Sequence, residues 1–519
     1  MRQAVILAAG YGMRMVPINS ETPKGLLTVR GEVLIERLIC QLRAAGVNKI
    51  RVVVGFMKEA FEYLIDDFNV ELLVNPEYHQ RNNLHSLALA EAYLSDAYIL
   101  PCDIWCAENP FSREETQSWY MVSTRRNPRS TVRVDQSGRL ARTEARDVGS
   151  EMIGIAYLTQ NDGIWFRERL RSMDADPQFS SAFWEEALFE KTYMRVPARV
   201  VPEYFAVELN TYEQLRELDA DSSHLHSETM ELIAAAMGGK TQDITGIQVL
   251  NKGMTNRSFL FSYKGSRYIM RIPGEGTDRL IDRRNEACVY QTIRALHICD
   301  DIIYINPDNG YKITKYVEHA RVCDPENEAD LKRAMQKLRE FHGLALQVDH
   351  AFDIFEQIDF YESLWNGETS AYPDYEKTKR RVLSLRSYVE RHRGQTVLTH
   401  IDAVPDNFLF TDEQTYLIDW EYAGMQDPHV DIAMFCIYAL YDRARIDRLI
   451  DLYFEGSCQP DIRVKIYCYI ASCGLLWSNW CEYKRQLGVE FGEYSLRQYR
   501  YAKDFYRIAA EEMKKLGEA

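Results

Sequence analysis

The chain has 519 residues, of which 46% are hydrophobic and 27% are charged, and its formal net charge is −15. This length exceeds the size at which a single hydrophobic core stops growing, so at least two globular domains are expected. The acidic charge argues against a general nucleic-acid-binding protein or a protein that binds anionic membrane surfaces, because either would need a basic face. Local basic pockets for phosphate groups are still compatible with it.

We predict neither a secretion signal nor a membrane-spanning segment. The apolar part of "MRQAVILAAG" is too short for a signal peptide, and no run of about 18 apolar residues occurs. The eleven cysteines are odd in number and include no CxxC pair, which fits neither a disulfide framework nor a zinc site. We therefore expect a cytoplasmic protein whose core contains the reduced thiols of Cys102, Cys106, Cys468 and Cys473. The sequence leaves monomer and homo-oligomer open.

Residues 1 to about 220 alternate short apolar runs with segments of helical periodicity. The predicted strands cover 3–9, 49–55, 70–76 and 97–104, and the predicted helices cover 32–46, 58–68 and 84–94. This βαβ rhythm predicts a Rossmann-like α/β domain, in which helices cover both faces of a mostly parallel sheet. The stretch "VRVDQSGRLAR" predicts an added hairpin that turns at Ser137 and Gly138.

The alternation of strand-like and helical segments ends at the polar stretch "ELDADSSHLHSETM". We place the domain boundary there, with domains at 1–222 and 223–519. Three predicted strands (247–254, 258–265 and 266–274) and a helix (279–296) follow. From about residue 327 helices dominate, with an interruption at 396–424. A small sheet followed by a helical part is the layout of an α+β, protein-kinase-like domain.

The stretch "LAAGYGMRMVPINSETPKGLLTVRG" follows the first predicted strand. Gly10 and Gly12 allow positive φ and a close approach of the backbone to phosphate oxygens, and the loop amides add donors. Arg14 and Lys24 would neutralise a nucleoside triphosphate and its pyrophosphate leaving group. Asp103 ends the strand "AYILPCD", at the sheet edge where open α/β sheets bind ligands, and its carboxylate suits Mg²⁺. A structural turn with two solvated cations is the alternative.

The same stretch resembles the nucleotidyltransferase signature LAAGxGxR…PK. The resemblance implies that Ala8 and Ala9 also contact the nucleotide. The later stretch "AVELNTYEQLREL" resembles the second metal-binding strand of that family, in which two acids alternate. Glu208 matches the first acid, and Asn210 replaces the second, which leaves one charge fewer on the metal.

Between Ala4 and about Leu218 the chain is most similar to the choline-phosphate cytidylyltransferases of bacterial phosphocholine pathways. The likeness rests on "PKGLL", "NPEYHQRNNLHSLALA" and "FWEEAL". It implies that Asn82 and Asn83 lie near the nucleotide and that aromatic residues enclose a trimethylammonium group. Trp184 and Tyr157 are the candidates, and a place in the hydrophobic core is an equally good interpretation of both.

The stretch "LTHIDAVPDNFLF" contains His400-x-Asp402-x₄-Asn407, which is the spacing of the kinase catalytic loop. Asp402 would accept the proton of the substrate hydroxyl or orient that hydroxyl, and Asn407 would bind Mg²⁺. Asp419 in "YLIDWE" stands at a strand end, where the second metal-binding acid belongs. A chance combination of structural turns is the alternative.

The small sheet offers further candidates for the nucleotide. "NKGMTNRSFLF" predicts a turn that covers the phosphates, with Thr255 and Asn256 at its centre. Arg271 stands where most kinases carry lysine, and Glu286 in the next helix would pair with it. A surface salt bridge is the alternative.

The stretch "IDWEYAGMQDPHVDIAMF" resembles the choline/ethanolamine kinase motif, and the likeness covers about residues 240 to 500. It implies that Trp477 and Trp480 of "WSNW", three residues apart on one helix face, are walls of an aromatic cage for a quaternary ammonium. Tyr422 would be a further wall and Glu421 the countercharge. Ordinary core packing is the alternative.

Together, the two resemblances imply a bifunctional enzyme that makes CDP-choline. The second domain would phosphorylate choline with ATP, and the first would join phosphocholine to CTP, both with Mg²⁺. Small molecules are then the expected partners. The alternatives are ethanolamine as the substrate, a sugar phosphate with UTP or dTTP, or one domain that only binds nucleotide as a regulatory module.

Overall fold

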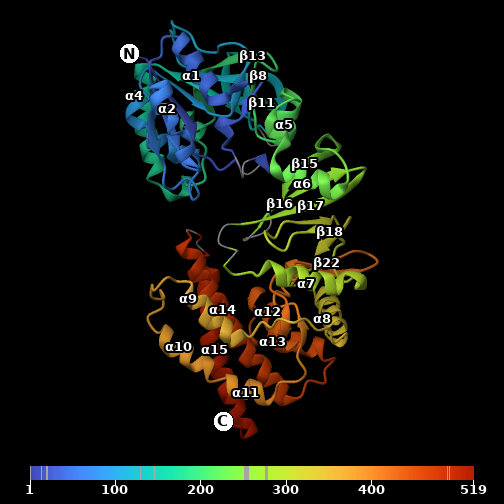
Figure 1. Ribbon diagram of the computed structural model, residues 1–519. Coiled ribbons are helices and arrows are strands. Elements are labelled where there is room, and N and C mark those ends of the chain that lie inside the picture. Colours follow the sequence, from blue (N-terminus) through green and yellow to red (C-terminus); the bar gives the residue numbers. More distant parts are fainter. Residues whose placement is uncertain are drawn as a thin grey trace. The chain divides into compact units, whose positions relative to one another are not determined.

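The computed structural model describes residues 2–12, 15–18, 22–128, 130–143, 148–250, 256–274, 277, 279–487, 489 and 491–518. The chain divides into two compact units, Met1–Val249 and Leu250–Ala519 (Figure 1). Among these described residues, no helix is long and apolar enough to cross a membrane.

The first unit is built on one large mixed sheet with the strand order β5-β4-β1-β6-β11-β8-β13-β10-β9. Neighbours from β5 to β6 are parallel, as are β8 and β13, whereas β11 is antiparallel to both of its neighbours. The bounds are β1 (Gln3–Ala8), β4 (Lys49–Val54), β5 (Glu71–Val74), β6 (Ala97–Pro101), β8 (Trp119–Asn127), β9 (Val132–Val134), β10 (Arg139–Arg142), β11 (Gly149–Leu158), β12 (Phe189–Glu190, paired with β13) and β13 (Tyr193–Val201). The predicted hairpin is confirmed as β9 and β10.

Helices cover both faces of this sheet because the buried residues of β1 alternate between two cores. Ala4, Ile6 and Ala8 pack with α1 and α2, and Val5 and Leu7 pack with α3 and α4. The helices are α1 (Leu34–Ala44), α2 (Tyr63–Phe68), α3 (Asn83–Ala88), α4 (Gln160–Asp174), α5 (Tyr212–Leu218) and α6 (Glu228–Met237). Two predicted helices are shorter than expected: 58–68 begins as a 3₁₀ turn, and 84–94 ends as one.

Short paired strands complete the first unit. β7 (Ile104–Cys106) pairs antiparallel with β14 (Ala206–Glu208), and β2 (Thr28–Val29) pairs with β3 (Glu32–Val33). β15 (Ile244–Leu250) follows α6. The β7–β14 pair is important for the site because it brings the end of "AVELN" beside the residues that follow β6.

The second unit begins with a small sheet, in which neighbouring strands have the order β16-β17-β19-β18. The sequence predicts β16 and β17 but neither β18 nor β19. They are β16 (Asn256–Tyr263), β17 (Ser266–Pro273), β18 (Ile302–Ile305) and β19 (Lys312–Lys315). The following helix, α7 (Arg283–Ile293), begins later than predicted because the Asp282 carboxylate caps it, accepting hydrogen bonds from the amides of Arg284 and Asn285.

The rest of the second unit is mainly helical, around one large core. The long helix α14 packs against α15, α12 and α9, and Figure 1 shows α14 and α15 side by side. The helices are α8 (Glu328–Gly343), α9 (Ile354–Ser363), α10 (Tyr375–Leu383), α11 (Arg386–Arg391), α12 (His429–Tyr438), α13 (Arg443–Tyr453), α14 (Pro460–Gln486) and α15 (Glu493–Leu516). Short strands interrupt them: β20 (Arg321–Val322), β21 (Val397–Thr399), β22 (Phe408–Phe410), β23 (Thr415–Leu417) and β24 (Gly424–Gln426).

Candidate active sites

In the first unit, the glycine loop lies at the carboxyl end of β1. Gly12 has a φ of +66°, and a Cβ atom at this position would lie 2.9 Å from Cγ of Lys24, so only glycine fits against the lysine stem. Ala8 and Ala9 are buried, and Gly10 is exposed beside them. Arg14 lies outside the described residues.

Lys24 joins two strand ends that are far apart in the sequence. Its Nζ donates to Oδ2 of Asp103 and to Oδ1 of Asn210, at 3.0 Å each. The Leu209 amide also donates to the carbonyl of Asp103, at 2.8 Å. Asp103 and Asn210 therefore meet over one ammonium group, and both offer oxygen atoms there.

Asn210 is held by the start of α5. Thr211 caps this helix, and the Gln214 side chain accepts hydrogen bonds from the amides of Asn210 and Thr211. Glu208, two residues earlier, lies opposite Ile104 in the β14–β7 pair. It lines a small pocket of about 100 Å³.

Asn82 and Asn83 bind the segment around residues 180 to 184. Asn82 caps α3, and its amide group donates to the carbonyl of Ser181. The Oδ1 atom of Asn83 accepts from the amide of Trp184, at 2.9 Å. The polar side chains of both residues thus have structural partners, and contact with a nucleotide stays a prediction.

The structure contradicts the two aromatic residues that we predicted around a trimethylammonium group in this unit. Trp184 is 1% exposed and packs against Tyr120 and Phe166 within the core. Tyr157 pairs with Tyr98 near the amino end of β6, at the sheet edge opposite Asp103, and donates to Asp96. The core interpretation is the correct one for both, because aromatic residues on inward-facing positions maximise buried area.

Glu185, next to Trp184, is a half-buried acid that the sequence analysis did not single out. Its Oε1 accepts from the Tyr120 hydroxyl at 3.2 Å, and its Oε2 is buried with no hydrogen-bond partner among the described residues. Burial raises the pKa of this carboxyl to about 7, and the nearby charge of Glu208 acts in the same direction.

We expect Glu185→Gln to stabilise the protein at pH 8 but not at pH 5. A folded-state pKa above the unfolded value of 4.5 means that stability falls as pH rises from about 4.5 through about 7. The difference corresponds to about 3 kcal/mol. Thermal unfolding of the full chain at both pH values measures it. Glu186→Gln, at a half-exposed neighbour that pairs with Arg142, is the control, and equal shifts for both variants would contradict the expectation.

In the second unit, the predicted catalytic loop lies between β21 and β22. Nδ2 of Asn407 donates to the backbone carbonyl and to Oδ2 of Asp402, at 2.8 and 3.2 Å. The Ile418 amide donates to the carbonyl of Asn407, so the loop is also tied to the segment that carries Asp419. Asp402, Asn407 and Asp419 are thereby brought together.

Asp431 on α12 holds this loop, and the sequence analysis missed it. Its fully buried carboxylate accepts from the amides of His400 and Ile401, at 3.0 and 2.7 Å, and contacts Nε2 of His342 at 3.0 Å. Ile401 has a φ of +69°, which is costly for a β-branched residue. The two amide hydrogen bonds help to stabilise that strained conformation, which places Asp402.

Burial raises the pKa of Asp402 well above its usual range, and the charges of Asp419 and Glu421 raise it further. Asp419 is partly exposed and faces two cations, Arg271 and Lys312, each with a nitrogen 3.8 Å from Oδ1. A carboxylate of raised pKa beside a cluster of acids and cations suits proton acceptance from a hydroxyl.

Arg271 and Glu286 form a buried pair, with nitrogen–oxygen distances of 2.5 and 2.8 Å, so a surface salt bridge is excluded. Although burial alone would raise the pKa of Glu286, Arg271, Lys312 and Arg283 lower it to about 2. The cations of Lys312 and Arg283 were not singled out from the sequence. Thr255 lies outside the described residues, and Asn256 begins β16.

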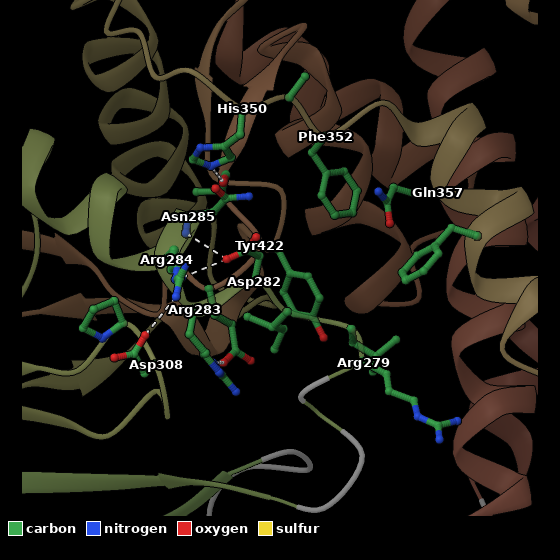
Figure 2. Close-up of a pocket in the computed structure, with 17 residues that line it drawn as sticks. Arg279, Asp282, Arg283, Arg284, Asn285, Asp308, His350, Phe352, Gln357 and Tyr422 are labelled. Carbon is green, nitrogen blue, oxygen red and sulfur yellow. Dashed lines mark hydrogen bonds and ion pairs between the residues drawn. The ribbon is translucent and has the colours of Figure 1, made fainter.

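Glu421 belongs to the same ion cluster. Its Oε2 lies 3.1 Å from Arg283 and 3.3 Å from Arg271. Two guanidinium groups therefore share its charge, and its role as the countercharge of the aromatic cage stays a prediction. Glu421 and Tyr422 also line a cavity of about 620 Å³, which Figure 2 shows between the start of α7 and residues 350 to 360.

Trp477, Trp480 and Tyr422 do come together. Their exposed fractions are 6%, 4% and 8%, and the rings of Tyr422 and Trp477 are 6.0 Å apart at 60°. Tyr361 on α9, which the sequence analysis missed, has a buried hydroxyl with no hydrogen-bond partner among the described residues, and its pKa is raised by burial and by Asp402. Tyr422 lies near Tyr361, Trp477 and Trp480, and Asp402 lies near both tyrosines, so the four rings form one cluster close to Asp402.

Comparisons with known proteins match the two halves of the chain to two different enzyme families. A family model described as "MobA-like NTP transferase domain" matches residues 4–146. The first half is 31% identical, over 165 residues, to the choline-phosphate cytidylyltransferase of Haemophilus influenzae, and the match covers 31% of this chain and 70% of that protein. The chain belongs to this cytidylyltransferase family.

The cytidylyltransferase half is also 31% identical, over 194 residues, to the 2-aminoethylphosphonate cytidylyltransferase of Lancefieldella rimae, covering 36% of this chain and 78% of that protein. A model described as "Phosphotransferase enzyme family" matches residues 246–465. The chain is also similar to the solved structure of choline kinase LicA from Streptococcus pneumoniae, at 26% identity and a TM-score of 0.49, over 54% of this chain and 100% of that one. The family matches confirm a bifunctional enzyme with the predicted domain types and order.

The oxygen donors in both halves fit Mg²⁺ that arrives with a nucleotide. Among the described residues, no group of three or more His, Cys, Asp or Glu side chains is arranged to hold a metal by itself. Asp103 and Asn210 in the cytidylyltransferase half, and Asn407 and Asp419 in the phosphotransferase half, offer hard oxygen ligands. Mg²⁺ commonly takes one or two protein carboxylates and completes its shell with phosphates and water.

Proposed function

We propose that this enzyme makes CDP-choline in two steps, one in each half. The phosphotransferase half transfers the γ-phosphoryl group of ATP to the choline hydroxyl, giving phosphocholine and ADP. The cytidylyltransferase half then joins phosphocholine to the α-phosphorus of CTP and releases pyrophosphate. The single observation that carries the choice of choline is the buried group of Trp477, Trp480 and Tyr422, since a quaternary ammonium offers no hydrogen to donate and is bound by aromatic faces.

In the phosphotransferase half, Asp402 accepts the proton of the choline hydroxyl as that oxygen attacks the γ-phosphorus. Asn407 fixes the Asp402 carboxylate, and Asp431 fixes the loop backbone. Arg271 and Lys312 offset the phosphate charge. Mg²⁺ held by Asn407 and Asp419 would supply further charge neutralisation at the phosphates.

In the cytidylyltransferase half, an oxygen of the phosphocholine phosphate attacks the α-phosphorus of CTP. The Lys24 ammonium lies where it can offset the charge that develops on the α-phosphate and on the leaving pyrophosphate. Mg²⁺ held by Asp103 and Asn210 would add to that charge neutralisation. Catalysis in both halves is thus positioning and electrostatic stabilisation.

We expect Trp477→Ala to raise KM for choline roughly five- to thirtyfold, because a desolvated cation–π contact contributes about 1–2 kcal/mol. The KM for ethanolamine should change less than threefold, because a primary ammonium is held chiefly by hydrogen-bond acceptors. Initial rates of ADP release with each alcohol measure both values. An equal rise for choline and ethanolamine would indicate that Trp477 only supports the fold.

A second candidate substrate for the cytidylyltransferase half is a primary ammonium such as phosphoethanolamine or 2-aminoethylphosphonate. Two observations favour it: Trp184 and Tyr157 are core residues rather than cage walls, and one relative is named for 2-aminoethylphosphonate. Pyrophosphate release from CTP, measured with each substrate in turn, tests the choice. Faster release with phosphocholine supports CDP-choline, and release with neither phosphocholine nor a primary-ammonium substrate would support a nucleotide-binding module.

A further inference from the structure

Lys484 brings a second cation to the aromatic cage. It lies four residues after Trp480 on α14, and its Nζ is 5.8 Å from the centre of the Trp480 ring. Only 4% of the residue is exposed, which is unusual for lysine. A lysine ammonium therefore lies over the ring of one of the aromatic residues to which we assign the substrate cation.

Two opposing effects act on the positive charge of Lys484. Burial lowers the pKa of its ammonium, and the negative charge of Glu421 opposes that effect. Glu421 also contacts Arg271 and Arg283, so its charge does not act on Lys484 alone.

Lys484 lies close to the exposed end of α14. α14 ends at Gln486, and the residues on either side of that end, Arg485 and Leu487, are exposed. The four-carbon stem of lysine can move its ammonium several ångströms toward the helix end without a change in the backbone.

We propose that Lys484 is an internal competitor of the substrate cation, and that choline binds by displacing the Lys484 ammonium from the Trp480 face toward solvent. This inference rests on the proposed function, because it concerns the same cage. Lys484 would then set the affinity of the cage. A ligand must bind the Trp480 face more favourably than the lysine ammonium does, and a methylated ammonium does so through its larger apolar surface.

Equilibrium binding of tetramethylammonium and of choline to the full chain tests the proposal without catalysis. We expect Lys484→Met to bind tetramethylammonium roughly three- to thirtyfold more tightly than the natural protein, because the competing cation–π contact is removed. Lys484→Arg keeps a cation and should bind like the natural protein or more weakly. Thermal unfolding establishes that each variant is folded.

A chemical readout distinguishes displacement from a structural role. Tetramethylammonium has no amine, so amine-reactive labelling followed by mass spectrometry reports lysines alone. We expect labelling of Lys484 to speed up when tetramethylammonium is added, while labelling of exposed Lys515 stays constant. A structural lysine would show no change or slower labelling.

The outcomes separate the inference from the function on which it rests. Saturable binding with equal or weaker affinity in Lys484→Met, or unchanged labelling of Lys484, would overturn the inference alone. The absence of saturable binding of tetramethylammonium and choline in all three proteins would overturn the cage, and with it the proposed substrate.

Discussion

Asp402→Asn is expected to lower kcat for phosphoryl transfer to choline by about 10²- to 10⁴-fold, because an amide cannot accept the hydroxyl proton. Asparagine keeps the shape of the side chain, and the hydrogen bond from Asn407 to the backbone carbonyl of residue 402 remains. The fall should therefore appear in kcat more than in KM. ADP release under saturating choline and ATP measures it.

The matched control for this variant is Asp406→Asn. Asp406 belongs to the same loop but is exposed and accepts a hydrogen bond from Tyr438, at 2.7 Å. It should retain most of the activity, and pyrophosphate release by the cytidylyltransferase half should be unchanged in both variants. Asp402→Asn with more than a tenth of the natural rate would exclude Asp402 as the proton acceptor.

Lys24→Met is expected to lower kcat for cytidylyl transfer by about 10²- to 10³-fold, which is the typical loss when one preorganised charged donor is removed from a transition state. Methionine keeps the unbranched stem that packs against Gly12. The variant also leaves the Asp103 carboxylate without its ammonium partner. Pyrophosphate release from CTP and phosphocholine is the measurement, and phosphoryl transfer from ATP in the same sample is the internal reference.

Lys58→Met, at an exposed lysine of the same unit, is the control for the loss of one positive charge. It should change the rate less than twofold. A rate for Lys24→Met within threefold of the natural rate would show that Lys24 has no part in catalysis. An equal fall in phosphoryl transfer would indicate a general loss of folded protein.

The sequence was sufficient to predict those parts of the fold that follow from local patterns. Apolar runs predicted the strands β1, β4, β5 and β6, and the turn at Ser137 and Gly138 predicted the hairpin of β9 and β10. Lengths were less certain because they depend on capping: the Asp282 carboxylate, rather than apolar periodicity, decides where α7 begins.

Several residues that the sequence motifs assigned to one site are also close together in the structure. Lys24, Asp103 and Asn210 come from three separate segments, yet each stands at a strand end or in the glycine loop, and strand ends meet at one edge of an α/β sheet. Asp402 and Asn407 are also close together because they belong to one short loop, and the hydrogen bond from the Ile418 amide to the Asn407 carbonyl places Asp419 beside them.

Aromatic residues were harder to interpret, because the sequence does not reveal whether a buried ring packs within the hydrophobic core or lines a binding site. Trp184 and Trp480 are almost equally buried, yet one packs against Tyr120 and Phe166, and the other faces the ammonium of Lys484. Only the three-dimensional neighbours distinguish a cage wall from a core residue.

The residues that the sequence analysis missed act through long-range contacts. Asp431 reaches back about thirty positions to the amides of His400 and Ile401, and Lys312 meets Glu286 and Asp419 from another strand. A buried acid at the start of the apolar stretch "VDIAMF" was the available signal for Asp431, since a fully buried carboxylate requires partners. No local pattern marks Lys312.

³¹P NMR of the full protein with Mg²⁺, choline and CTP, with and without ATP, shows whether one chain carries out both steps. We expect phosphocholine, then CDP-choline and pyrophosphate, only when ATP is present, and CDP-choline without ATP when phosphocholine replaces choline. Phosphocholine that accumulates from choline, together with no CDP-choline from phosphocholine and CTP, would contradict the assignment of the first half. No phosphocholine from choline and ATP would contradict the assignment of the second.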